Sequence, residues 1–219
     1  MIADNLLRVR ERIAAVCLKA GRSPDAVTLI TVTKDRSIEE IKEIISQGVI
    51  DIGENRIQEA LLKYNAFKDR QALKWHMVGH LQTNKVKDAL KIFDLIHSVD
   101  SFRLAGEIDK QAAKISKVQD CLIEVKTSPE ATKFGVNPEE TLEFIKQIAQ
   151  FKNIRVKGLM TIAPLVDMPE LVRPYFRQLR ELRDEINGEL LLSMGMSDDF
   201  EVAIEEGANI IRLGRVIFA

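Results

Sequence analysis

Short apolar runs alternate with longer stretches of helical periodicity along the whole chain. The first helical stretch ends at a glycine, Gly21, and carries its apolar side chains on one face: Leu6, Val9, Ile13, Val16 and Ala20. After this predicted helix come eight short runs with the composition of buried strands. These runs are residues 27–33, 49–52, 74–78, 94–99, 121–126, 154–161, 190–193 and 209–213.

Strands that alternate with helices predict a parallel sheet, because each strand must be joined to the next by a crossover connection. Eight such units in 219 residues fit an α/β protein with a (β/α)8 TIM barrel and an extra N-terminal helix. An open doubly wound sheet is the alternative. Such a sheet usually carries a glycine-rich turn after an early strand, and this sequence has none there. No linker or low-complexity segment divides the chain, so we predict one domain over residues 1–219.

The charge balance excludes one class of function. The chain has 32 basic and 33 acidic residues, and it lacks the basic field that a nucleic-acid partner would require. Charged residues recur every few positions near the N-terminus, so we predict no signal peptide and no membrane span. The two cysteines, Cys17 and Cys121, are far apart and are interpreted as buried, reduced thiols. We therefore expect a cytoplasmic protein. We also expect a monomer, and a weak dimer is the open alternative.

A lysine directly follows the first predicted strand. In barrels of this kind the chemistry lies at the carboxyl ends of the strands, and within TLITVTKDRS (28–37) the strand runs straight into Lys34. An ammonium group driven towards an apolar interior tends to lose its proton, and a neutral amine is a nucleophile. A buried, reactive lysine is thus one interpretation of Lys34, and a plain surface lysine is the other.

The segments after the seventh and eighth predicted strands have the features of an anion site. They read SMGMSDD and RLGR, and the glycines Gly195 and Gly214 would let the backbone approach a ligand closely. Ser197 precedes a predicted helix whose N-terminus would present free N–H groups, and barrels often bind phosphate at this place. The alternative is that Ser197 only caps its helix and Gly214 only turns the chain.

A reactive lysine beside a phosphate site suits a phosphorylated aldehyde, and pyridoxal 5′-phosphate (PLP) is the commonest ligand of this kind. Arg212 could then face the pyridine nitrogen of PLP and disfavour its protonation; a salt bridge to an acidic neighbour is the alternative. His80 and Asn55 are predicted to hydrogen-bond a ligand or to tie loops together. His76 and His80 are four residues apart, but strand-like residues and a glycine separate them, so we predict no metal site.

Five blocks of the sequence, in this order, resemble the pyridoxal phosphate homeostasis proteins, which are single-domain relatives of the alanine racemase barrel. The resemblance covers about residues 5 to 218, and its blocks are GENRIQE (53–59), WHMVGHLQTNKVK (75–87), KFGVNP (133–138), GLMTIAP (158–164) and LSMGMSDDFEVAIEEGANIIRLG (192–214).

The resemblance implies a role for each candidate residue. Lys34 would hold PLP as a Schiff base, and Arg212 would face the pyridine nitrogen. The phosphate-binding positions would be Ser197 and Gly214, with backbone around Gly195 and Arg212, while Asn55 and His80 would line the pocket. The family takes part in intracellular PLP homeostasis and has no established catalytic activity.

Three hypotheses follow. The first is a PLP carrier or regulator without appreciable turnover, with PLP-dependent apoenzymes as candidate partners. The second is an amino-acid racemase of the same fold, which needs an acid/base group on each face of the substrate carbon. The tyrosines, Tyr64 and Tyr175, both fall within helical patterns, so the second group is not evident. The third is an aldolase-like barrel in which Lys34 reacts with a sugar phosphate.

Overall fold

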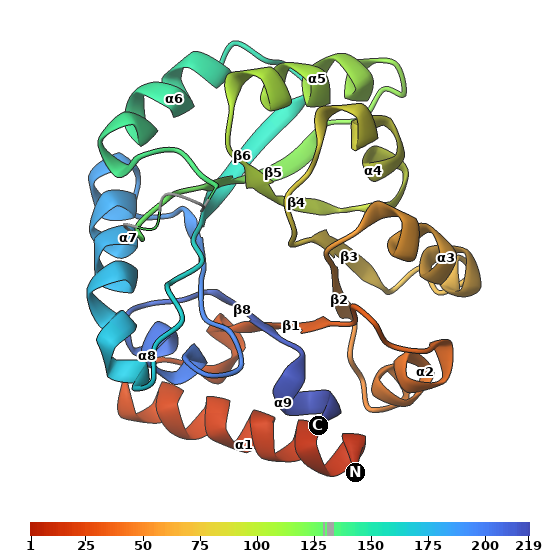
Figure 1. Cartoon of the computed structure of the whole chain (residues 1–219), viewed down its shortest axis with the longest axis vertical. Helices are drawn as coiled ribbons and strands as arrows, with labels where there is room; N and C mark the ends of the chain where they lie inside the picture. Colours follow the sequence, from red (N-terminus) through yellow and green to blue (C-terminus); the bar gives the residue numbers. More distant parts are fainter. Residues whose placement is uncertain (129, 131–133) are drawn as a thin grey trace.

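Eight parallel strands form a closed barrel in the computed structural model, which describes residues 1–128, 130 and 134–219. Each strand pairs with the next along the chain, and β8 closes the barrel by pairing with β1 (Figure 1). The predicted TIM barrel is therefore confirmed over the open sheet. The strands are β1 (Thr28–Val32), β2 (Asp51–Glu54), β3 (Lys74–Met77), β4 (Leu95–Val99), β5 (Gln119–Glu124), β6 (Ile154–Met160), β7 (Leu191–Ser193) and β8 (Ile210–Leu213). Lys133, the first residue of the KFGVNP block, lies outside the described residues.

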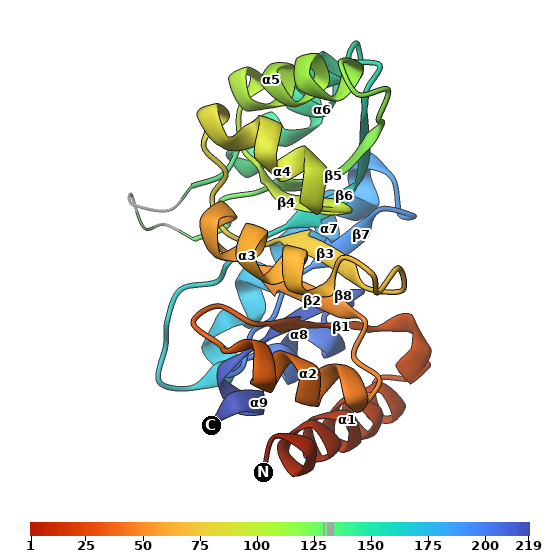
Figure 2. The same cartoon turned by 90° about the vertical axis from the view of Figure 1, so that its right-hand side faces the viewer.

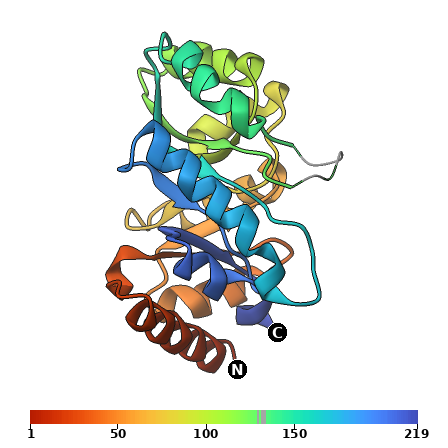
Figure 3. The same cartoon turned by 90° about the vertical axis from the view of Figure 1, so that its left-hand side faces the viewer.

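Helices surround the barrel. Figure 2 shows α2, α3 and α4 along one side, and Figure 3 shows α7 along the opposite side. The helices are α1 (Ile2–Lys19), α2 (Ile38–Ser46), α3 (Ile57–Phe67), α4 (Val86–Ile92), α5 (Phe102–Ala113), α6 (Thr141–Ile148), α7 (Arg173–Ile186), α8 (Phe200–Glu205) and α9 (Arg215–Phe218). Within the described part of the chain, none of the helices has both the length and the apolar character needed to cross a membrane.

The extra N-terminal helix, α1, ends where the sequence predicts. Gly21 adopts a φ of +66°, and the N–H of Arg22 donates to the carbonyl of Cys17 at 2.8 Å, which is the Schellman termination. The apolar face of α1 is buried, with Ala20 at its edge only partly so. The helix packs against α2, α8 and α9. Two long-range contacts fix it there: Arg12 pairs with Glu201 at 3.0 Å, and Asn5 Nδ2 donates to the carbonyl of Ala219 at 2.9 Å.

Two apolar layers result from the alternation of side chains along the strands. The larger layer lies between the barrel and its helices and includes Cys17 and Cys121, which are both buried free thiols, as predicted. The smaller layer contains residues from strands on different sides of the barrel, which can meet only inside it: Ile30, Leu95, Leu122, Met160 and Ile210. Further interior positions are polar and buried, among them His76, His97, Ser193 and Arg212.

Candidate functional site

The carboxyl ends of β1, β7 and β8 lie side by side, because β8 pairs with both of the other strands. Lys34 follows β1, Gly195 and Ser197 follow β7, and Gly214 follows β8. Four of the candidate residues, from opposite ends of the sequence, are therefore brought to one side of the barrel mouth.

Lys34 is exposed, so the expectation of a lysine buried in the apolar interior is wrong. The physical reason is that β1 ends at Val32 and a tight turn begins at once, with the carbonyl of Thr33 accepting from the N–H of Arg36 at 3.1 Å. Asp35 has a φ of +58°, a left-handed conformation that aspartate tolerates better than most residues. The turn lifts the amine of Lys34 to the rim of the barrel, where solvent reaches it.

The residue before Lys34 is held by a buried ion pair that sequence reasoning missed. Lys63 Nζ lies 2.7 Å from Glu54 Oε1 and also donates to the carbonyl of Thr33. The hydroxyl of Thr33 donates to the same carboxylate oxygen of Glu54. Burial raises the pKa of Glu54, although the hydrogen bonds from Lys63 and Thr33 oppose the rise. The available signal was Lys63 itself, which stands on the apolar face of α3 between Ala60 and Phe67.

Ser197 does not cap α8, so that alternative is wrong. Helix α8 begins at Phe200 with Asp199 as its N-cap residue, and the carboxylate of Asp199 accepts from the N–H of Met196 at 2.6 Å. Burial raises the pKa of Asp199. The hydroxyl of Ser197 instead accepts from the N–H of Val216 at 3.3 Å, in the first turn of α9. This hydrogen bond joins the exit of β7 to the exit of β8.

Both glycines of the predicted anion site occupy positions that a larger residue would disturb. Gly195 has a φ of +95°, and a Cβ on it would lie 2.6 Å from the Cβ of Ala203. Gly214 is the N-cap residue of α9, and a Cβ there would lie 3.0 Å from the carbonyl oxygen of Val32. Gly214 therefore does turn the chain, and it does so directly beside β1. Ser197 lines a cavity of about 450 Å³ between these loops and the segment after β6.

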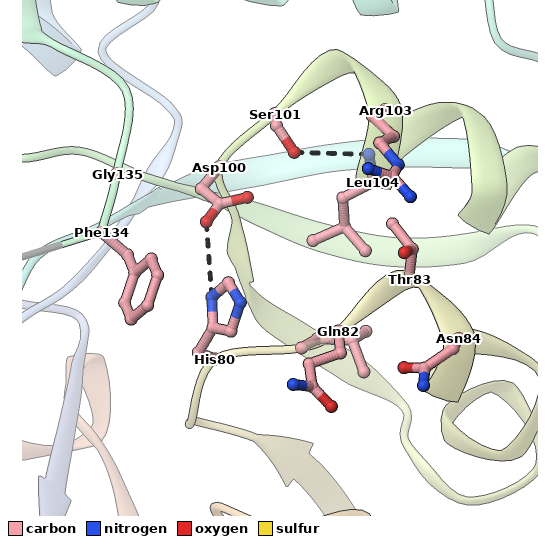
Figure 4. A pocket seen from close by; sticks show the side chains of 11 residues that line it. His80, Gln82, Thr83, Asn84, Asp100, Ser101, Arg103, Leu104, Phe134 and Gly135 are labelled. Carbon is pink, nitrogen blue, oxygen red and sulfur yellow. Dashed lines mark hydrogen bonds and ion pairs between the residues drawn. The ribbon is translucent and has the colours of Figure 1, made fainter.

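Asn55 and His80 follow the neighbouring strands β2 and β3. Their loops touch through Gly79, where a Cβ would lie 2.6 Å from the carbonyl oxygen of Asn55. His80 Nδ1 lies 3.4 Å from Asp100 Oδ2, and the imidazole stacks on Phe134 with a centroid separation of 3.9 Å (Figure 4). His80 lines a cavity of about 630 Å³ at the exits of β3, β4 and β5, separate from the cavity that Ser197 lines.

Arg212 is buried inside the barrel, with 5% of its surface exposed. One guanidinium nitrogen donates to Ser193 Oγ at 2.7 Å and another to the carbonyl of Thr161 at 3.0 Å, so both acceptors are neutral. Burial lowers the pKa of Arg212 to about 10, while the carboxylates of Asp199 and Glu124 oppose that shift. The side chain is therefore a fixed cation at neutral pH.

The two histidines that stand four residues apart point to different places. His76 lies on β3 and faces the interior, where its ring nitrogens contact His97 and Asp51. His80 is exposed at the mouth. Among the described residues, no group of three or more histidine, cysteine, aspartate or glutamate side chains is arranged to hold a metal ion.

Comparison with known proteins gives a consistent result. Residues 5–219 match the family described as alanine racemase, N-terminal domain. A pyridoxal phosphate homeostasis protein of Aquifex aeolicus is 50% identical over 220 residues, which cover 98% of this chain and 96% of that protein. A crystal structure described as that of an unknown protein from Bifidobacterium adolescentis superposes with a TM-score of 0.94 at 36% identity, covering 99% of this chain and 94% of the other.

A further solved structure is that of PipY from Synechococcus elongatus, described with PLP bound. It matches with a TM-score of 0.87 and 35% identity over 100% of both chains. Full-length similarity at these identities, together with the closed barrel, identifies the family: this chain belongs to the pyridoxal phosphate homeostasis proteins, within the alanine racemase N-terminal domain family.

Proposed function

We propose that this chain binds PLP reversibly through a Schiff base between Lys34 Nζ and the PLP aldehyde, and that it contributes to PLP homeostasis without appreciable turnover. The observation that carries the proposal is the adjacency of three exits: the amine of Lys34 after β1, and the hydrogen-bonded Ser197 and Val216 after β7 and β8. The 35% identical PipY, described with PLP bound, supports the same ligand.

The residues of the mouth fit the chemical groups of PLP. Lys34 offers an amine for the aldehyde, and Ser197 offers a hydroxyl, beside the close backbone of Gly195 and Gly214, for the phosphate. Arg212 offers a donor to the pyridine nitrogen. When bound, PLP would supply an electrophilic carbon and an electron-withdrawing ring. Because Lys34 is exposed, water can reach its side chain, which favours reversible binding over permanent storage.

Two features favour a carrier over a racemase. A guanidinium can only donate hydrogen bonds, so Arg212 would disfavour protonation of the pyridine nitrogen and weaken PLP as an electron sink. The tyrosines also lie in the helical layer: Tyr64 packs edge-on against Trp75 with ring centroids 5.7 Å apart, and Tyr175 packs against the core on α7. Neither tyrosine is placed to act as the second acid/base group at the mouth.

Our proposal includes the setting in which the protein works. We propose a single-domain, cytoplasmic monomer, with PLP-dependent apoenzymes as the proteins that receive PLP from it. The exposed position of Lys34 is compatible with transfer, since a recipient could approach the barrel mouth without opening the core.

The test is a visible spectrum of the protein mixed with PLP, followed by borohydride reduction and peptide mapping. We expect a yellow protein with the adduct on Lys34. The colour and the adduct should be lost in Lys34→Ala and kept in the control Lys42→Ala, because Lys42 is an exposed lysine on α2. Proton exchange at the α-carbon of added amino acids, followed in D2O, should stay at the rate of free PLP. An adduct elsewhere would refute the Lys34 site, and rapid exchange lost in Lys34→Ala would favour the racemase. A colourless protein would favour the sugar-phosphate alternative.

A further inference from the structure

A row of hydrogen-bonded polar side chains crosses the interior of the barrel. It begins at Arg212, which donates to Ser193 Oγ at 2.7 Å, and Ser193 Oγ lies 2.9 Å from His97 Nδ1. His97 Nε2 lies 3.2 Å from His76 Nδ1, and His76 Nε2 lies 2.9 Å from Asp51 Oδ1. The side chains between the two ends are buried, with Ser193 and His97 fully so. Four different strands, β2, β3, β4 and β7, hold the row against Arg212 on β8.

The two ends of the row lie at different depths in the barrel. Asp51 is the first residue of β2, at the end of the barrel opposite the mouth, and it lines a cavity of about 310 Å³ there. Arg212 is the third of the four residues of β8 and lies nearer the mouth. The row therefore links the far end of the barrel to the cation beneath the proposed PLP site.

With both imidazoles neutral, the chemistry of the two ends fixes the direction of every hydrogen bond between them. A guanidinium has donors only and a carboxylate has acceptors only. Ser193 Oγ must therefore accept from Arg212 and give its own proton to His97 Nδ1. His97 then carries its proton on Nε2 and donates to His76 Nδ1. His76 likewise carries its proton on Nε2 and donates to Asp51. In this arrangement both imidazoles have the Nε2–H tautomer.

Hydrogen bonds that all run in one direction polarise and strengthen one another, so the row should respond as a unit. Its effect falls on Arg212, whose guanidinium is held by Ser193 on one nitrogen and by the carbonyl of Thr161 on another. We infer that Ser193, His97, His76 and Asp51 are positioning residues that fix the orientation of the Arg212 guanidinium through this row. The consequence for PLP rests on the function proposed above, whereas the row and its direction do not.

The surroundings of His97 favour the neutral state that the row requires. His97 is enclosed by the barrel, and burial, His76 and Arg212 all lower its pKa well below the ordinary value. A proton added to His97 would occupy Nδ1, so the ring would present a donor instead of an acceptor to Ser193 Oγ. The common direction of the hydrogen bonds would then be lost at this contact, and Ser193 would lose its acceptor on the side facing away from Arg212.

The first test is ¹⁵N NMR of the imidazole and guanidinium groups in the PLP-free protein. The chain has three histidines, so their signals can be assigned by single substitutions, with exposed His80 as the reference. We expect His76 and His97 as Nε2–H tautomers at neutral pH, and separate, slowly exchanging guanidinium signals for Arg212. Nδ1–H tautomers or charged imidazoles at neutral pH would overturn the inference.

The second test asks whether the row acts as a unit. In Ser193→Ala the separate guanidinium signals of Arg212 should be lost. The imidazole signals of His76 should also shift, although His76 does not contact residue 193. Ser193→Thr, which keeps the hydroxyl, should show the wild-type signals of both residues. Ser98→Ala is the matched control, because Ser98 is fully buried beside His97 in the chain but is not a member of the row. His76→Gln should alter the guanidinium signals of Arg212, although Ser193 and His97 stand between the two residues in the row. This variant replaces Ser193→Ala as the test if Ser193→Ala does not fold. Unchanged Arg212 signals in both variants would overturn the inference.

The third test connects the row to PLP. If Arg212 is positioned for the pyridine nitrogen, Ser193→Ala should shift the absorption maximum of bound PLP and the pH at which it changes, and Ser98→Ala should leave both unchanged. An unshifted spectrum in Ser193→Ala would overturn the link to PLP. A wild-type protein that binds no PLP but shows the expected tautomers would refute the proposed function and leave the positioning row intact.

Discussion

Lys63 Nζ lies 2.7 Å from Glu54 Oε1 in the layer between the barrel and α3. Both side chains are almost completely buried, and the same ammonium group also binds the carbonyl of Thr33, the residue before Lys34. A buried ion pair of this kind contributes little net stability relative to apolar residues, but it becomes costly when one partner is removed. The pair therefore fixes the strand end that carries Lys34.

Replacement of Lys63 by methionine should destabilise the protein by about 3–5 kcal/mol at neutral pH, because Glu54 would be left as an uncompensated buried charge. Chemical denaturation measures this. Without Lys63 the pKa of Glu54, already raised by burial, should rise further. A carboxyl group with a raised folded-state pKa costs stability above that pKa, and the cost disappears below its unfolded-state pKa. The loss in Lys63→Met should therefore shrink as the pH falls towards 4.

The matched control is Lys68→Met, since Lys68 is exposed directly after α3 and should tolerate the change within about 0.5 kcal/mol. Equal stabilities of Lys63→Met and Lys68→Met would contradict a structural role for the buried pair.

Gly79→Ala should both destabilise the protein and weaken PLP binding. A Cβ at this position would lie 2.6 Å from the carbonyl oxygen of Asn55 and 2.8 Å from its Cα, and neither backbone atom can move away alone. Overpacking of this kind costs about 1–3 kcal/mol, and it would shift two loops of the proposed pocket together. Gly188→Ala is the control, because a Cβ there meets nothing within 4 Å. The free energy of unfolding, from chemical denaturation, and the affinity for PLP, from titration, should both be lower in Gly79→Ala than in Gly188→Ala. Similar values for the two variants would show that the close contact at Gly79 determines neither stability nor binding.

Ser197→Ala should weaken PLP binding by roughly tenfold to hundredfold, the range for a hydrogen bond to a charged group worth about 1.5–3 kcal/mol. The reason is that Ser197 is the hydroxyl proposed for the phosphate. Titration of PLP by absorbance measures the effect. Ser46→Ala, at an exposed serine on α2, should leave the affinity unchanged. If Ser197→Ala binds PLP as tightly as the wild type, the phosphate must be held elsewhere.

His97 should make the folded state sensitive to acid. Because its folded-state pKa is well below the ordinary value of 6.5, the unfolded chain takes up a proton first as the pH falls. The stability from neutral His97 is complete above about pH 6.5 and is lost below it, at no more than about 1.4 kcal/mol per pH unit.

The free energy of unfolding of His97→Gln should consequently depend less steeply on pH between 7 and 5 than that of the wild type. His80→Gln, at the exposed histidine, should retain the wild-type slope. Parallel curves for His97→Gln and the wild type would mean that His97 is protonated alike in both states.

Much of the barrel could be predicted from the alternation of apolar runs and helical stretches, because each run needs only its own composition to be recognised. The run at 94–99, for example, became β4 at Leu95–Val99. The run at 49–52 was placed too early, since β2 spans Asp51–Glu54. Val49 is buried without being part of the strand, so apolar character alone set the wrong boundary.

The site was less accessible to sequence reasoning. Gly195, Ser197 and Gly214 were correctly predicted to be neighbours. They stand in glycine- and serine-containing segments at strand exits, and the barrel topology determines which exits are adjacent. The exposure of Lys34 depended on a turn that no apolar pattern reveals. The contact between His97 and Ser193 joins residues 96 positions apart, and it exists only once the barrel has closed.

The position of α1 has a consequence for the order in which the protein can assemble during synthesis. This helix leaves the ribosome before α8 and α9, against which it packs, and its Arg12 and Asn5 bind Glu201 and Ala219. Its apolar face, including Leu6, Val9 and Ile13, can meet α2 early but lacks α8 and α9 until these helices have emerged. Contacts of such high sequence separation form slowly. Until α9 has emerged, the nascent chain therefore carries a partly uncovered apolar helix, and chaperones that hold such segments should bind it at α1.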